Sequence, residues 1–147
     1  MSHYKHILLA VDFTEHGENV AKKAQELAKD NQAQLSVVHV VDDLPIVDAS
    51  YESIIPLDVG LTEQLIDMAK QRLTKMANKL AIAEDKQWLE IGSAPLEIAR
   101  IAEENDVDLI VVGSHGRHGL ALLLGSTANG VLHHATCDVL AVRLKND

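Results

Sequence analysis

The stretch that decides the fold is LIVVGSHGRHGLALLLGST, residues 109–127. It opens with four consecutive apolar residues, a pattern typical of a strand that is covered on both faces of a parallel sheet. Four glycines and a closing Ser-Thr pair follow within residues 113–127. Glycine clusters mark places where the backbone turns sharply or approaches another group closely. The stretch therefore predicts a buried strand that leads into a tight, backbone-lined turn.

Apolar runs and helical repeats alternate along the rest of the chain. Short apolar runs occupy 7–11, 35–41 and 139–142, and a mixed run at 87–91 has the character of an edge strand. Apolar residues recur at helical spacing over 20–28, 61–80, 96–102 and 127–135, and Pro95 suits the first turn of the third helix. This alternation predicts one α/β domain over residues 1–147, a Rossmann-like open sheet with right-handed crossovers. Residues 43–60, which are interrupted by prolines and a glycine, predict a loop or partial helix within the second crossover.

Composition narrows the classes of partner and the compartment. The 147 residues carry a formal net charge of −9, which disfavours binding to nucleic acid or to anionic lipid. The apolar run at 7–11 is too short for a signal peptide or a membrane span. A single cysteine, Cys137, cannot form an internal disulfide, so we expect a cytoplasmic protein. His115 with His118, and His134 with Cys137, do not complete a metal-ligand set of known spacing.

Candidate binding residues gather at the carboxyl ends of the predicted strands, where open α/β sheets bind their ligands. Asp12 follows the first strand and Gly113 ends the fourth, while Ser126 and Thr127 open the last helix. Glycine amides and a helix start favour an anion. The stretch from 109 to 137 contains no Asp or Glu, although the chain has 22 acidic residues. A buried strand and an apolar helix also lack acids, so this observation supports an anion site and a structural origin equally.

Each candidate residue also has a structural interpretation. Asp12 is suited to capping the first helix, and Gly113 and Gly116 are suited to a tight turn. Arg117 and His118 have the character of exposed loop cations as well as of phosphate ligands. The glycine pattern is neither a dinucleotide fingerprint nor a P-loop, because the chain has no lysine between positions 86 and 145. No nucleophile-elbow motif supports a Ser-His-Asp triad, and Cys137 is expected to be structural.

Four segments carry a family resemblance: KHILLAVD at 5–12, VHVVD at 38–42, DLIVVGSHG at 108–116, and GST at 125–127 followed by HATCDVLAVR at 134–143. Through them the sequence resembles the bacterial universal stress proteins over essentially its whole length. The resemblance implies a five-stranded parallel sheet in the order 3-2-1-4-5 with helices on both faces. It also implies a homodimer formed through the last strand, Val139–Arg143. Independently, an apolar strand at a sheet edge invites pairing with a second copy.

Nucleotide-binding members of the family hold ATP, with Mg²⁺, through a Gly-x2-Gly-x9-Gly-Ser/Thr motif. The residues that the resemblance places in such a site are Asp12 and Val40 beside adenine and ribose, Val112 in the base pocket, Gly113 and Gly116 in the ribose and phosphate loop, and Gly125, Ser126 and Thr127 at the phosphates. Arg117 joins this set as a candidate phosphate contact.

The chain departs from the motif in one respect. Eight residues, 117–124, separate the second and third motif glycines where the motif has nine. One extended residue spans about 3 Å, and hydrogen bonds fail at smaller errors than that. Two functions therefore stay open: a stress-response regulator or sensor that binds ATP or a related adenine nucleotide, and a dimeric interaction module with a vestigial pocket. An enzyme has no positive support, and we expect at most slow ATP hydrolysis.

Overall fold

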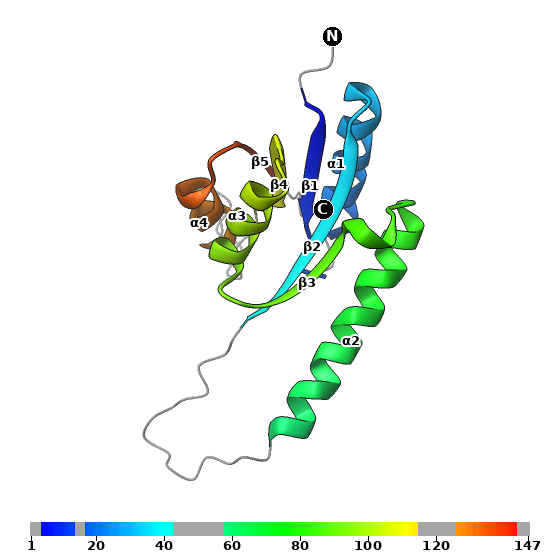
Figure 1. Cartoon of the computed structure of the whole chain (residues 1–147), viewed down its shortest axis with the longest axis vertical. Coiled ribbons are helices and arrows are strands. Elements are labelled where there is room, and N and C mark those ends of the chain that lie inside the picture. The colour runs from blue at the N-terminus through cyan, green and yellow to red at the C-terminus, as the bar shows by residue number, and fades with distance from the viewer. Residues whose placement is uncertain (1–3, 14–16, 43–57, 115–125, 144–147) are drawn as a thin grey trace.

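The computed structural model describes residues 4–13, 17–42, 58–114 and 126–143. Its strands are β1 (His6–Ala10), β2 (Gln34–Asp42), β3 (Gln87–Gly92), β4 (Leu109–Gly113) and β5 (Asp138–Val142). They form one five-stranded sheet in the order β3-β2-β1-β4-β5, in which each strand runs parallel to its neighbours (Figure 1). The expected sheet type and strand order are confirmed, with β3 and β5 at the two edges.

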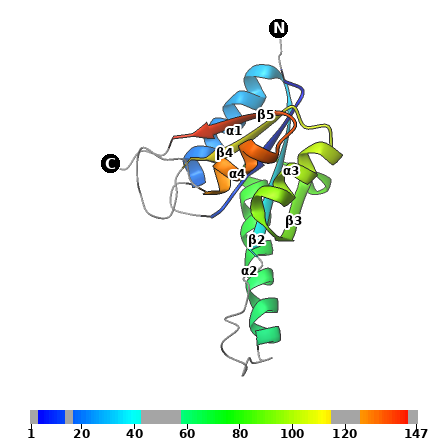
Figure 2. The same cartoon turned by 90° about the vertical axis from the view of Figure 1, so that its left-hand side faces the viewer.

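The helices cover both faces of the sheet, as expected. They are α1 (Gly17–Asn31), α2 (Asp58–Lys79), α3 (Ala94–Glu104) and α4 (Ser126–His134), with a short 3-10 turn η1 (Glu84–Lys86) before β3. One face carries α1 and α2 and the other carries α3 and α4 (Figures 1 and 2). Because α2 begins at Asp58, the end of the predicted loop or partial helix at 43–60 is helical; residues 43–57 lie outside the described part of the chain.

Alternation along β1 builds the two cores. Ile7 and Leu9 belong to the cluster under α1 and α2, whereas Leu8 belongs to the cluster under α3 and α4. All three side chains are fully buried, as the near-continuous apolar runs predicted. α1 contributes mainly small buried residues to its cluster, among them Ala21, Ala24 and Ala28. The cores are therefore aliphatic and divided by the sheet.

The apolar face of α2 is only partly buried. Leu73 and Ala77 belong to the core cluster against the sheet and Ala69 is also buried, whereas Leu65 and Met68 are 47% and 49% exposed. Figure 1 shows the reason, since the first half of α2 extends beyond the sheet. Periodicity predicts which residues share a face, but the position of the neighbouring layer decides how far along the helix that face is covered.

Three helices end on a residue in the left-handed conformation, and none of the three is glycine. Gln32, Ala81 and Asp106 have φ of 53°, 58° and 55° after α1, α2 and α3. In each case the next N–H donates to a carbonyl five residues back: Ala33 to Ala28 at 2.8 Å, Ile82 to Ala77 at 2.8 Å, and Val107 to Ala102 at 2.9 Å. This bonding satisfies helix carbonyls that would otherwise lack a partner. It turns the chain into the next element at the amino edge of the sheet.

The two helices on the second face touch at Gly130 of α4. A Cβ added to Gly130 would lie 2.6 Å from both Cβ and Cγ of Pro95, in the first turn of α3. Real Cβ atoms do not approach other atoms so closely, and a proline ring cannot rotate away. The absence of a side chain at position 130 therefore lets the two helix backbones pack closely.

Candidate functional site

The candidate site lies where the strand order reverses, between β1 and β4. From β1 the chain adds β2 and β3 on one side, and then β4 and β5 on the other. Crossovers on opposite sides leave a crevice beyond the carboxyl ends of such neighbouring strands. Asp12 follows β1 at this edge, and Gly113 ends β4 at the same edge. The structure therefore brings together two candidates that lie about a hundred positions apart in the sequence.

Asp12 is exposed and lies beside the start of α1. Its Oδ1 is 4.0 Å from the position that a Cβ on Gly17 would take. Gly17 is the first residue of α1, where the positive end of the helix dipole favours a carboxylate. This placement is compatible both with a role at the start of α1 and with contact to a ligand at the carboxyl edge.

Val40 and Val112 lie on the face covered by α3 and α4. Both are buried, and they share one cluster with Ala128 in the first turn of α4. The β4 edge continues past Gly113, because the Ser114 N–H donates to the Val142 carbonyl at 2.9 Å. Val40 and Val112 are therefore part of the apolar core on the side of the sheet where α4 begins.

The start of α4 supplies the other end of the candidate site. Ser126 and Thr127 are exposed in its first turn, which contains no acidic residue. The first N–H groups of a helix have no partner within the helix and favour an anion. Gly116, Arg117 and Gly125, three other predicted site residues, lie outside the described residues.

Sequence reasoning missed two residues that hold the segment after β1. His39 of β2 places Nδ1 2.7 Å from the Val11 carbonyl oxygen. The Phe13 ring lies against the His39 ring, with centroids 4.4 Å apart and a tilt of 48°. Phe13 has φ of 57°, which is rare for a residue with a large side chain. The only signal in the sequence was a histidine within the apolar run of β2.

A buried polar cluster lies at the opposite, amino edge of the sheet. His6 of β1 bonds through Nε2 to Ser36 Oγ and through Nδ1 to the Asn105 carbonyl at 3.0 Å. An Asp108 carboxylate oxygen accepts the N–H groups of Lys5 at 2.6 Å and His6 at 3.0 Å. Burial lowers the pKa of His6 below its ordinary value. Because Ser36 is fully buried, the serine–histidine pair offers no nucleophile to a substrate.

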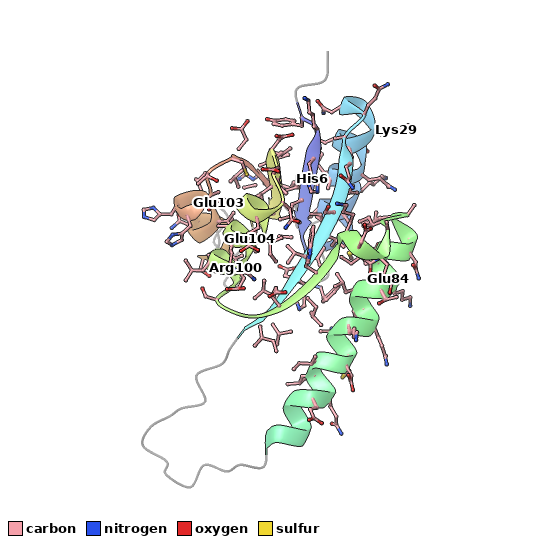
Figure 3. The ribbon with its side chains drawn as sticks, in the orientation of Figure 1. His6, Lys29, Glu84, Arg100, Glu103 and Glu104 are labelled. Carbon is pink, nitrogen blue, oxygen red and sulfur yellow. The ribbon has the colours of Figure 1, made fainter. Side chains whose placement is uncertain are left out.

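Other chemically notable groups give no further site in the described part of the chain. Burial raises the pKa of the Cys137 thiol, which therefore stays protonated at neutral pH. Arg100 forms ion pairs with Glu90, Glu97 and Glu104 on an exposed surface, where such pairs contribute little stability. Figure 3 labels Arg100 and Glu104 of this group. Over the described ranges, no group of three or more His, Cys, Asp or Glu is placed to hold a metal ion. No described helix has the length and apolar character needed to cross a membrane.

Comparison with known proteins agrees with this geometry. The model of the universal stress protein family matches residues 3–143. Universal stress protein A homologs 2 and 1 of Coxiella burnetii are 44% and 42% identical to this chain over 146 and 143 residues. These matches cover 99% and 97% of this chain and 99% of each relative.

Solved structures share the fold. The structure of the hypothetical protein MJ0577 superposes with a TM-score of 0.77 at 30% identity, over 98% of this chain and 99% of that one. A universal stress protein solved in complex with cAMP has a TM-score of 0.61 at 19% identity, over 95% and 96% of the two chains, a likeness of fold alone. The family model matches nearly the whole chain, the relatives are similar over nearly their full length, and the sheet order agrees. The chain therefore belongs to the universal stress protein family.

Proposed function

We propose that this protein binds ATP or a related adenine nucleotide at the carboxyl edge of the sheet and acts as a stress-response regulator or sensor in the cytoplasm. The observation that carries the proposal is the polarity of the candidate site. A carboxylate, Asp12, lies at β1, and an acid-free helix start lies at α4. A carboxylate repels phosphate but accepts hydrogen bonds from ribose hydroxyls or a base amino group. The amides at the helix start favour phosphate.

This polarity suits a ligand with donors at one end and negative charge at the other. Val40 and Val112 supply buried apolar surface on the same side of the sheet as α4. The solved relative that carries cAMP shows that a chain of this fold can hold an adenine nucleotide. Binding to the folded state would stabilise the protein by mass action, by about 2.7 kcal/mol at a ligand concentration of 100 times Kd. The fraction of protein with nucleotide bound, and with it the stability of the fold, would therefore rise with the nucleotide concentration.

Replacing Asp12 with alanine is expected to weaken nucleotide binding about 10- to 100-fold, the value of a hydrogen bond to a charged group. The measurement is titration calorimetry with ATP and Mg²⁺, together with mass spectrometry of any nucleotide released from denatured protein. Asp30→Ala is the matched control, since Asp30 is exposed in the last turn of α1, at the other end of that helix. If the unaltered protein releases no nucleotide and binds none at millimolar ATP, the vestigial-pocket function replaces this one.

We further propose that two copies pair through β5, the edge strand next to β4. The side chains of Val139, Leu140, Ala141 and Val142 are half-buried. Leu132 of α4 is 55% exposed, although its neighbour Val131 is fully buried. Helical spacing places Leu132 on the flank of α4 opposite Gly130, which contacts α3. Exposed apolar surface beside an unpaired strand edge is what an isologous dimer would cover.

Leu132→Glu is expected to convert the dimer to a monomer, because the interface would bury an unpaired carboxylate. Light scattering after gel filtration measures the mass. Leu96→Glu is the matched control, since Leu96 is 51% exposed but lies in the first turn of α3. A dimer that survives Leu132→Glu, or that Leu96→Glu breaks equally, would remove α4 and β5 from the interface.

A further inference from the structure

The chain after β1 is fastened to β2 through Val11. The Val11 N–H donates to the Val38 carbonyl at 2.9 Å. The Val11 carbonyl accepts a hydrogen bond from His39 Nδ1 at 2.7 Å. A carbonyl has no proton to give, so Nδ1 must carry the hydrogen. Both polar groups of Val11, the residue before Asp12, are therefore held by β2.

Phe13, on the other side of Asp12, is held by the same histidine. Its φ of 57° is an unfavourable, left-handed conformation for a residue with a Cβ. Such a conformation persists only where its surroundings enforce it, and it is commonest at functional sites. Here the ring packs on His39 and against the α1/α2 core. His39 thus contacts both neighbours of Asp12.

We propose that His39 is a positioning residue that sets the direction of the Asp12 carboxylate at the carboxyl edge of the sheet. The inference rests on the proposed nucleotide site for its consequence, but its structural content concerns the protein without ligand. Asp12 is exposed and lies between Val11 and Phe13, both of which His39 contacts. With Val11 and Phe13 both fixed, the Asp12 backbone has little freedom, so its side chain starts from a defined direction.

Two substitutions separate the hydrogen bond from the bulk of the ring. His39→Asn keeps an N–H donor at the branch position that Nδ1 occupies, whereas His39→Leu fills similar space without a donor. Phe13→Gly leaves the donor in place but removes the ring and releases the constraint on φ. His134→Leu is the matched control, because His134 is exposed in the last turn of α4.

The first measurement uses the protein without nucleotide and follows the carboxyl 13C resonance of Asp12 by NMR. We expect His39→Leu and Phe13→Gly to shift this resonance, and His39→Asn and His134→Leu to leave it near its original position. An Asp12 resonance that His39→Leu and Phe13→Gly both leave unchanged would overturn the inference. If His39→Leu fails to fold, Phe13→Gly carries the same test.

The second measurement is a double-mutant cycle on ATP affinity. In the unaltered background, His39→Leu is expected to weaken binding about 5- to 10-fold, a coupling typical of residues that are linked through a shared backbone segment. In the Asp12→Ala background the same change is expected to cost less than about two-fold, because no carboxylate remains to be positioned. An equal loss in both backgrounds would show that His39 acts through another group. Absence of ATP binding by the unaltered protein would reject the nucleotide function and leave the NMR result to decide the role of His39.

Discussion

Gly130→Val is expected to destabilise the fold by about 2–3 kcal/mol, the upper range for an overpacked contact. The first added atom alone would stand 2.6 Å from two carbons of the Pro95 ring. Neither group can move away at low cost. The added Cβ is bonded directly to the backbone of α4, and the Pro95 ring is bonded to its own backbone nitrogen. Gly130→Ala improves intrinsic helix propensity by about 1 kcal/mol. We nevertheless expect it to be destabilising, because the clash arises at Cβ.

Urea unfolding at neutral pH measures both variants. Asn129→Val, at an exposed neighbouring position of α4, is the control and is expected to change stability by less than about 0.5 kcal/mol. Pairing Gly130→Ala with Pro95→Gly removes both ring carbons, so the two changes should be strongly non-additive in the stabilising direction. A Gly130→Ala protein as stable as the original would mean that relieving the clash with Pro95 costs no more than the roughly 1 kcal/mol gained in helix propensity.

His6→Leu is expected to lose about 3 kcal/mol at pH 7.5, because two groups lose their partner when the imidazole is removed. The Ser36 hydroxyl is fully buried, and the Asn105 carbonyl belongs to the residue that directly follows α3. Leucine offers neither a donor nor an acceptor to replace these bonds. Ser36→Ala removes one hydrogen bond of the same cluster and is expected to cost less, about 1–2 kcal/mol.

The contribution of His6 is also expected to depend on pH. Burial is the main cause that lowers the folded-state pKa of His6, and Lys86 adds to it; the Asn105 carbonyl, Asp108 and Asp106 oppose it. The unfolded chain therefore binds a proton more readily than the folded chain. The contribution of His6 to the free energy of unfolding is fully present above the pKa of histidine in the unfolded chain, about 6.5. It is lost as the pH falls through the lower pKa that His6 has in the folded chain.

The gap in unfolding free energy between the original protein and His6→Leu should accordingly narrow between pH 7.5 and pH 5. Subtracting the unfolding free energy of His6→Leu from that of the original protein removes the pH dependence that comes from titratable groups present in both proteins. His134→Leu, at an exposed histidine, should leave the gap to the original protein close to zero throughout. A constant gap across this range would show that His6 accepts a proton as readily in the folded chain as in the unfolded one.

Much of the fold followed from residue patterns. Apolar runs located each strand, and helical spacing located each helix, because both signals come from burial on a regular surface. The strand order came from the resemblance to a family. The exposure of Leu65 and Met68 could not be predicted, since their spacing matches that of the buried residues further along α2. The contact at Gly130 depends on how two helices dock, which no local pattern records.

Only some of the residues around the candidate site could be recognised from local sequence patterns. Asp12 and Gly113 stood out because they interrupt apolar runs at strand ends. His39 and Phe13 did not, because their role lies in a contact between neighbouring strands and in a backbone conformation. The helix ends were missed likewise: glycine is the usual signal for a left-handed terminus. Gln32, Ala81 and Asp106 occupy that conformation instead.

These three helix ends and the His6 cluster all lie at the amino edge of the sheet, while the candidate ligand residues that the structure describes lie at or near the carboxyl edge. Substitutions that alter the stability of the fold at the amino edge are therefore far in space from substitutions that alter the candidate site. A substitution at the amino edge, for instance glycine at a left-handed helix end, could therefore change thermal stability without altering the candidate site at the opposite edge. Such a division would let the stability of one scaffold vary while its candidate site stays the same.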